Sequence, residues 1–430
     1  MQIYTVAEGD SIYSISRLFG TPASLIISDN ELADPTQLAI GQSLLIRQPT
    51  TVYVAQNGDT VSSVAEKYGS TAWELWRQNP ALGGRGDLYA GENLVIYAEA
   101  PAYGPLVTNA YVYPFVDQET LRKTLPYLTY ITIFTYGIRS DGTLIAPGND
   151  TAEADIISIA REYGTRPLMM LSTLTEDGFF SNELAGYVLG NADVRDTVVR
   201  NVADTVERLG YAGVDIDFEY LGADNASAYS DFVQEVNDAL KARGDYVVWV
   251  ALAPKSSPDQ AGLIYEGHDY AALANAADRA LLMTYEWGYA FGAPQAISPL
   301  SQVRRVVDYA VSVAPPDKYM LGMPNYGYDW ALPYVMGETE AEAISSAEAP
   351  RRAFERKARI MYDEAAASPY YSYYQNGKEH IVWFEDARSV YAKAGLIYDA
   401  MLYGAGIWNG MKFWSPLWLI LNGLYEIVKF

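Results

Sequence analysis

The chain has 430 residues and a formal net charge of −23 at pH 7, and half of its residues are hydrophobic. This length exceeds what one hydrophobic core usually fills, so we expect two or three globular domains rather than a disordered chain. The negative charge would repel the phosphates of nucleic acids and anionic lipid surfaces, so we expect neither as a partner.

The lack of cysteine excludes a disulfide framework, a thiolate zinc site and a cysteine nucleophile. The chain has only two histidines, His268 and His380, which lie far apart in the sequence. A histidine-rich metal site or a Ser-His-Asp triad is therefore improbable, and we expect no metal and no other cofactor.

The first hundred residues contain an internal repeat with an offset of 49 to 50 positions. Tyr4-Thr5-Val6 followed by Gly9-Asp10-Ser11 returns as Tyr53-Val54-Ala55 followed by Gly58-Asp59-Thr60. In each copy the serine or threonine can cap a helix that carries a regular apolar stripe. Each copy is predicted to fold as strand, helix, helix, strand.

The repeat resembles the LysM module, over residues 1–48 and 50–98. This resemblance implies binding to glycans that contain N-acetylglucosamine. The implied binding residues are Gly9, Asp10, Ser11 and Asn30 in the first copy and Gly58, Asp59, Thr60 and Asn79 in the second. The first copy has Glu31 where the second has Pro80, so equal affinity is not expected. The alternative is a pair of packing domains without a ligand.

A segment rich in Ala, Pro and Gly over residues 99–105 predicts a linker. Beyond it, short β-branched and aromatic runs alternate with helical patterns, which is typical of parallel βα units in an α/β fold. Eight such units predict a (β/α)8 TIM barrel spanning residues 106–430. The eight expected strands lie near residues 110–115, 130–135, 167–172, 213–219, 247–252, 280–285, 319–323 and 404–408.

The gap between the seventh and eighth expected strands is too long for one crossover helix. Its tyrosine-rich segment, Tyr370 to Phe384, predicts a small α+β insertion over about residues 331–385, before the last strand. The apolar stretch from Trp414 to Phe430 is interrupted by polar residues, so we expect a buried terminal helix and not a membrane span.

Three carboxylates, Asp215, Asp217 and Glu219, alternate with apolar residues on the expected fourth strand. A strand would place all three on one face, toward the barrel interior. Buried like charges are costly and raise carboxyl pKa values. The alternative, a solvated face of an edge strand, conflicts with helices on both sides of the sheet. We therefore predict proton transfer by Glu219 at the carboxyl end of this strand.

This strand resembles the D-x-x-D-x-D-x-E signature of glycoside hydrolase family 18, the chitinase-like family, with Ala212 in place of the first Asp. The resemblance continues at Met283-Thr284-Tyr285-Glu286, where the family has Asp in place of Glu286. It also covers Ala251 to Lys255, Gly322 to Tyr328 and Gly406 to Trp408. With two LysM modules in front, the chain is similar to the spore cortex-lytic N-acetylglucosaminidases of spore-forming bacteria.

Family resemblance implies a retaining mechanism in which the acetamido oxygen of the substrate attacks the anomeric carbon. It implies that Glu219 is the acid and base and that Asp217 binds the acetamido N–H. Asp215 would modulate the charge of Asp217, and Tyr285 would hold the acetamido carbonyl. The implied substrate-binding residues are Trp408, Met283, Glu286, Asn325 and Tyr326.

The implied partner is peptidoglycan or a chitin-type glycan, and the implied location is the spore coat, cortex or cell wall. The chain starts without the pattern of a secretory signal peptide, and we expect a monomer. Three alternatives stay open: a chitinase, a non-catalytic lectin-like barrel and a structural spore-surface protein. Glu219 favours an enzyme, whereas Ala212 keeps the structural alternative open.

Overall fold

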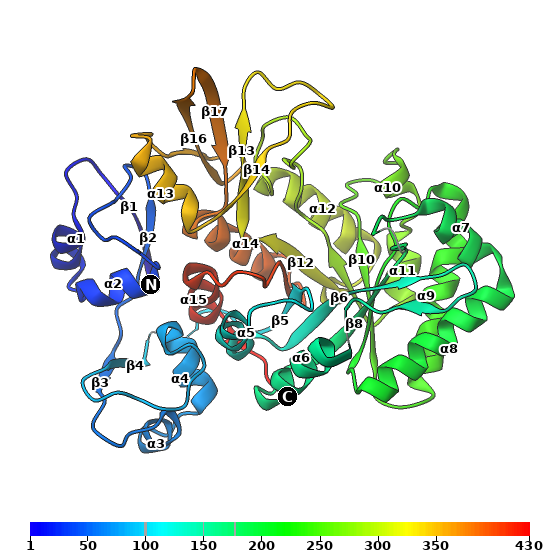
Figure 1. Ribbon diagram of the computed structural model, residues 1–430, viewed down its shortest axis with the longest axis horizontal. Helices are drawn as coiled ribbons and strands as arrows, with labels where there is room; N and C mark the ends of the chain where they lie inside the picture. The colour runs from blue at the N-terminus through cyan, green and yellow to red at the C-terminus, as the bar shows by residue number, and fades with distance from the viewer. Residues whose placement is uncertain (99–100, 149, 176–177) are drawn as a thin grey trace.

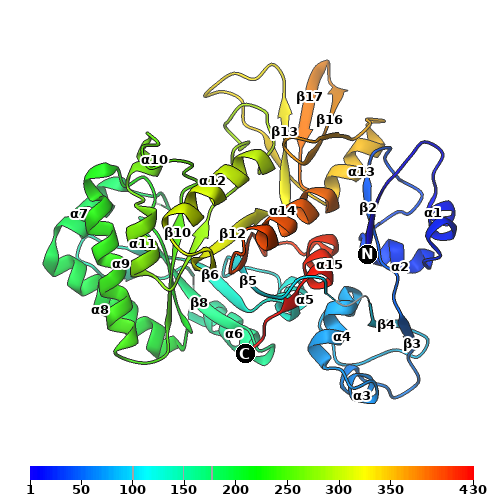
Figure 2. The ribbon, with the colours of Figure 1, turned by 180° about the vertical axis from the view of Figure 1, so that it is seen from behind.

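The computed structural model describes residues 1–98, 101–148, 150–175 and 178–430, so residues 99 and 100 of the predicted linker lie outside the described part. Two small modules lie on one side of a barrel, and a separate small sheet rises from the barrel beside them (Figure 1). The reverse view shows the same arrangement (Figure 2).

Each module has the predicted order of strand, helix, helix and strand, with its two strands paired antiparallel. Ser11 and Thr60 cap the first helix of their copies, because each hydroxyl accepts the backbone N–H of a serine three residues later. The elements of module 1 are β1 (Gln2–Thr5), α1 (Ile12–Phe19), α2 (Ala23–Asp29) and β2 (Ser43–Ile46). Those of module 2 are β3 (Thr51–Val54), α3 (Val61–Lys67), α4 (Ala72–Gln78) and β4 (Asn93–Tyr97).

Eight parallel strands close into a barrel, which confirms the predicted fold class. The strands in order are β5 (Pro105–Val112), β6 (Tyr130–Ile138), β8 (Arg166–Ser172), β9 (Gly213–Asp217), β10 (Val247–Leu252), β11 (Arg279–Leu282), β12 (Tyr319–Pro324) and β18 (Gly404–Trp408). The first strand begins at Pro105 and not near Ala110, because the polar pair Thr108 and Asn109 interrupts its apolar pattern although both are buried. The ladders of β9 and β11 end earlier than predicted, at Asp217 and Leu282.

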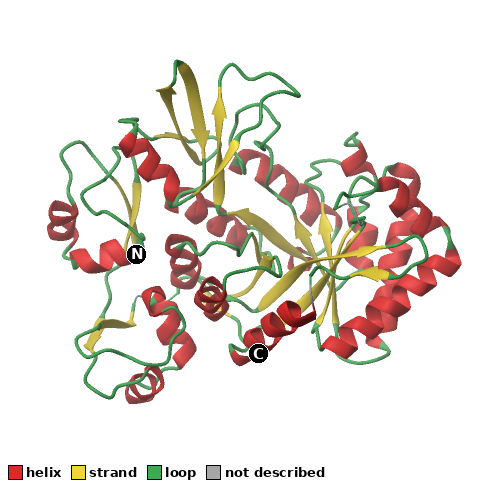
Figure 3. Cartoon of the chain, viewed as in Figure 1, coloured by secondary structure: helices red, strands yellow, loops and turns green. Residues whose placement is uncertain are grey.

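Helices surround the barrel and cover the outer faces of its strands (Figure 3). They are α5 (Gln118–Thr124), α6 (Asp150–Glu162), α7 (Asn182–Gly190), α8 (Ala192–Leu209), α9 (Ala226–Lys241), α10 (Leu263–Glu266), α11 (Tyr270–Ala276), α12 (Leu300–Val313), α14 (Ala387–Asp399) and α15 (Ser415–Leu424). Helix α15 is the predicted buried terminal helix, and the short β19 (Glu426–Ile427) then pairs with β5. Within the described residues, no helix has the length and apolar character needed to cross a membrane.

The insertion between β12 and β18 is an antiparallel sheet with one helix packed on it. It starts at Tyr326, earlier than the predicted residue 331, because the chain turns straight from β12 into a new strand. Its elements are β13 (Tyr326–Ala331), β14 (Glu342–Ser345), α13 (Glu348–Glu355), β15 (Met361–Asp363), β16 (Ser368–Gln375) and β17 (Lys378–Trp383). The tyrosine-rich segment forms the β16–β17 hairpin.

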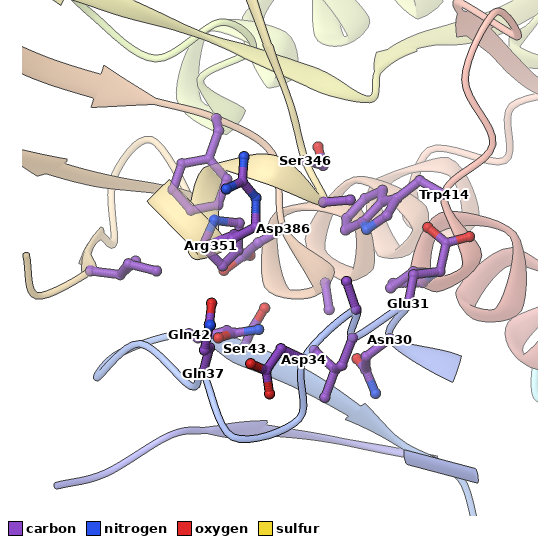
Figure 4. Close-up of a pocket in the computed structure, with 18 residues that line it drawn as sticks. Asn30, Glu31, Asp34, Gln37, Gln42, Ser43, Ser346, Arg351, Asp386 and Trp414 are labelled. Atoms are coloured by element: carbon purple, nitrogen blue, oxygen red, sulfur yellow. The ribbon is translucent and has the colours of Figure 1, made fainter. Parts of the chain in front are cut away.

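Module 1 is packed tightly against the insertion and α15 through the loop between α2 and β2. Ile360 donates its N–H to Ile40 O at 2.9 Å, and Arg388 donates to Gly41 O at 3.2 Å. Ser415 donates to the Glu31 carboxylate at 3.2 Å. These contacts surround a pocket between module 1 and the rest of the chain. Opposite module 1 it is lined by Ser346 of the insertion and by Trp414, just before α15 (Figure 4).

Module 2 is held to module 1 and to the barrel by other contacts. The buried Arg47 pairs with Asp29 at 2.7 Å and donates to Gln78 O at 2.9 Å, which joins the two modules. Tyr163, which follows α6, donates to Gly84 O at 2.8 Å, and its ring lies 5.3 Å from that of Trp76. Both modules are therefore fixed relative to the barrel.

Candidate active site

A pocket lies at the carboxyl ends of the barrel strands, where βα-barrel active sites are found. Six residues that the sequence predicted line it together: Asp217, Glu219, Met283, Tyr285, Glu286 and Trp408. They come from β9, β18 and the segment after β11, so the closure of the barrel brings distant motifs to one place.

Three carboxylates follow one another along β9 and just past its end, and two of them, Asp217 and Glu219, line the pocket, while Asp215 lies behind them, outside the lining. Asp215 is fully buried, and Tyr111 on β5 donates a hydrogen bond to its Oδ2 at 2.7 Å. Burial raises the pKa of Asp215 to about 6, although the Tyr111 hydrogen bond opposes this effect. Burial and the charges of Glu219 and Asp215 raise the pKa of Asp217 well above its ordinary value. Like charges this close cannot all ionise, so the row retains protons near neutral pH.

Glu219 lies just beyond the end of β9, at the mouth of the carboxylate row. Burial raises the pKa of its carboxyl to about 7. A carboxylic acid with a pKa near neutrality can give a proton to a leaving group and take one back from water. The site can therefore support general acid and base catalysis at one residue.

Aromatic rings form part of the wall of the pocket. The rings of Tyr285 and Trp408 are nearly parallel, with centroids 6.4 Å apart and an interplanar angle of 17°. Phe134 and Tyr113 meet the Trp408 ring at 5.3 and 6.4 Å. Such a surface suits the apolar face of a sugar ring.

Glu286 is held in place by the first strand of the insertion. Tyr326 donates a hydrogen bond to its Oε1, and Tyr328 donates to the same oxygen at 3.1 Å. Burial raises the pKa of Glu286, while these two hydrogen bonds oppose the rise. The insertion thus contributes Tyr328 to the pocket and fixes a carboxylate at its edge.

Two residues that were predicted to bind the substrate, Asn325 and Tyr326, do not line the pocket. Asn325 is buried outside the lining of the pocket, and its amide donates to Asn409 O at 2.9 Å. It therefore supports the loop that follows β18 and not the pocket itself. Tyr326 acts on the pocket through its hydrogen bond to Glu286.

Several lining residues were not among the predicted site residues, although Ala251 and Tyr328 belong to the family-like motifs: Tyr111, Tyr113, Phe134, Met170, Phe180, Ala251, Leu281 and Tyr328. Most are apolar or aromatic and lie at or near strand ends, where a sequence pattern cannot separate a pocket wall from barrel core. Tyr111 lies within the expected first strand, but a tyrosine among apolar strand residues does not by itself indicate a place in a pocket.

The side chains predicted to bind glycan in the modules are engaged within their own modules. Asn30 donates to Ile26 O and Leu45 O and accepts from Leu45 N, and Asn79 repeats the pattern in module 2. Asp10 and Asp59 each accept a tyrosine hydroxyl at 2.7 Å. We therefore assign these side chains to the module fold, while Gly9 and Gly58 lie on exposed turns.

Comparisons with known proteins agree with this geometry. The family model described as glycosyl hydrolases family 18 matches residues 108–411, and the LysM domain model matches residues 4–47 and 53–96. A cortical fragment-lytic enzyme of Bacillus subtilis is 37% identical and covers 100% of this chain and 99% of its own. The equivalent enzyme of Bacillus anthracis is 34% identical with the same coverage.

Solved structures give the same result. The crystal structure of the spore cortex-lytic enzyme SleL from Bacillus megaterium is similar over 100% of this chain and 99% of its own, with a TM-score of 0.83 and 36% identity. A chitinase from Chromobacterium violaceum shares the barrel fold over 74% of this chain, with a TM-score of 0.68 and 24% identity.

Proposed function

The chain belongs to glycosyl hydrolases family 18 and is a glycosidase, and we propose that it is an N-acetylglucosaminidase that degrades spore-cortex peptidoglycan during germination. The observation that carries this proposal is the pocket at the strand ends, where Asp217 and Glu219 line the wall with the buried Asp215 behind them. Relatives named for cortex lysis that match over their whole length, LysM modules included, support peptidoglycan as the substrate.

In the first step, Glu219 donates its proton to the glycosidic oxygen as the bond to the leaving sugar breaks. The acetamido oxygen of the substrate attacks the anomeric carbon from the opposite face and forms a cyclic oxazolinium ion. In the second step, Glu219 takes a proton from water, which opens the ring with retention of configuration. A pKa of about 7 suits both directions of transfer.

Asp217 and Tyr285 hold the acetamido group in this proposal. Asp217 accepts a hydrogen bond from the acetamido N–H and stabilises the positive charge of the oxazolinium ion. The Tyr285 hydroxyl donates a hydrogen bond to the acetamido oxygen. Asp215, which receives the hydrogen bond from Tyr111, shares the remaining negative charge with Asp217. Trp408 supports the sugar ring.

The modules would keep the barrel on polymeric glycan by making rebinding intramolecular. We assign most of this binding to module 2, because the tip of its loop between α4 and β4, at Tyr89, is exposed. Tyr89 in this loop is 68% exposed, whereas the matching residue of module 1, Ala39, is buried in the core of the insertion. A location at the spore cortex or cell wall follows from this binding.

The test is to incubate wild-type protein and Glu219→Gln with spore-cortex fragments, vegetative peptidoglycan and chitin oligomers, and to identify new reducing ends by mass spectrometry. We expect N-acetylglucosamine ends from cortex with wild type and none with Glu219→Gln, while an exposed control variant, Glu66→Gln, cleaves normally. Cleavage of chitin alone would make the protein a chitinase. Binding without cleavage would make it a lectin-like or structural protein.

A further inference from the structure

We propose that His268 is a positioning residue that fixes the peptide group between Phe218 and Glu219 and so aims the Glu219 carboxyl. His268 lies between α10 and α11, fully buried behind the end of β9. Its ring bridges the ends of two neighbouring barrel strands. The inference deepens the proposed function and rests on the assigned role of Glu219.

The backbone at Glu219 needs such support because the strand ladder ends before it. The last pair of β9 with β8 joins Asp217 to Ser172, and the last pair with β10 joins Ile216 to Val250. Glu219 is followed directly by Tyr220 in the left-handed region, at φ 56°. The peptide that carries Glu219 therefore lies outside the regular sheet, where β-sheet hydrogen bonds do not hold it.

His268 supplies the missing bond. Its Nε2 lies 2.9 Å from the carbonyl oxygen of Phe218, and its Nδ1 lies 2.8 Å from the backbone nitrogen of Ala253, just after β10. The Ala253 N–H can only donate, so Nδ1 must accept and Nε2 must carry the proton. The ring therefore donates to Phe218 O in one fixed tautomer.

The ring stays neutral while it does this. Burial lowers the pKa of His268 to about 4, and the nearby Lys255 charge acts in the same direction against the Phe218 hydrogen bond. His268 is thus neutral over the whole range in which Glu219 titrates. His268 therefore acts by holding the Phe218 carbonyl group in place, and it does not exchange protons with the substrate.

The surrounding side chains immobilise both ends of this bridge. The Phe218 ring is stacked between Tyr229, at 5.4 Å and 9°, and Phe232, at 5.3 Å and 21°. Lys255 donates to the carbonyl oxygen of His268 at 3.1 Å. These contacts hold the Phe218 ring and the His268 backbone, and the His268 bond to Phe218 O then fixes the peptide that carries Glu219.

A matched pair of variants tests the proposal. The amide of His268→Gln reaches the place of Nε2 and can still donate to Phe218 O, whereas the shorter His268→Asn reaches only the place of Nδ1. On soluble cortex fragments we expect His268→Asn to lower kcat by about 10- to 100-fold with KM changed less than about 2-fold, since small misplacements cost that much. His268→Gln should keep kcat within about 5-fold of wild type.

Wild-type kcat in His268→Asn, or equal losses in both variants, would overturn the inference. Full activity of Glu219→Gln would instead overturn the proposed function on which it rests. If His268→Asn does not fold, His268→Gln and the nitrogen NMR shifts of wild type decide, with His380→Gln used to assign signals. A neutral ring protonated at Nε2 from pH 5 to 9 supports the inference, and the other tautomer contradicts it.

Discussion

At the scale of single residues, the carboxylates of β9 combine two properties that rarely occur together, burial and mutual proximity. Burial alone raises the pKa of Asp215 to about 6 and that of Glu219 to about 7. The raised pKa of Glu219 affects both catalysis and stability, and the pH dependence of each can be measured separately.

Catalysis needs the protonated form of Glu219 to donate to the leaving oxygen. We therefore expect kcat on soluble fragments to fall as the pH rises through about 7, approaching a tenfold loss per pH unit above it. The measurement is a pH–rate profile under saturating substrate. A rate that stays level up to pH 9 would show that Glu219 is not the acid.

Stability follows the proton binding of the folded state. The pKa of Glu219 in the folded state is raised above its unfolded value of about 4.3. The protonated carboxyl therefore contributes its full stabilisation of the folded state below that pH, and this stabilisation is lost as the pH rises to about 7. Glu219→Gln removes this loss and should melt a few degrees higher than wild type at pH 8, with the gain vanishing near pH 4. Thermal melts across this range check it, with Glu66→Gln as the control that shows no such trend.

The sequence predicted the row of acids because strict alternation on a strand places them on one face. It could not predict that Tyr111 completes the row, since a tyrosine in an apolar strand has no distinctive pattern. It also placed Asn325 in the pocket, because a polar residue at a strand end has the same pattern whether it faces a ligand or a neighbouring loop carbonyl.

At the scale of elements, the two modules share one fold but differ in what covers their second loop. Module 1 has Glu31 at the position where module 2 has Pro80, and this difference has a structural reason. Glu31 has a φ of 50°, which proline cannot adopt. Its carboxyl bonds to Ser415 at the start of α15. The repeat allowed the fold of each module to be predicted. The residues of a loop, however, do not indicate which other part of the chain packs against it.

Gly41 and Gly91 form a matched pair that measures the contact between module 1 and the insertion. Both have a positive φ, at 86° and 91°, so alanine strains both backbones equally. A Cβ at Gly41 would lie 1.9 Å from Ile360 O, whereas one at Gly91 has nothing within 4 Å. We expect Gly41→Ala to cost about 1–3 kcal/mol more than Gly91→Ala.

Melting temperature and limited proteolysis check this difference, and cleavage between module 1 and module 2 should increase only in Gly41→Ala. Equal behaviour of the two variants would mean that module 1 is not held by this loop.

At the scale of the whole molecule, the proposed function assigns substrate capture to module 2 and cleavage to the barrel. Tyr89→Ala should therefore weaken binding to insoluble cortex several-fold while kcat/KM on soluble fragments stays unchanged. Tyr13→Ala, which removes an equally exposed tyrosine from α1 of module 1, is the control. Sedimentation assays with cortex and kinetics on fragments separate the two quantities, and equal effects of both variants would refute the assignment to module 2.

The bridge from Arg47 to Gln78 and the contact of Tyr163 with Gly84 hold module 2 in a fixed position relative to the catalytic pocket. An enzyme whose binding module is attached by a flexible linker can cut anywhere within reach of that linker. Here, the distance between module 2 and the catalytic pocket is fixed. If module 2 binds a glycan strand as proposed, the scissile bond lies a fixed number of sugars away from the bound segment. Digests of long strands should then show a preferred fragment length.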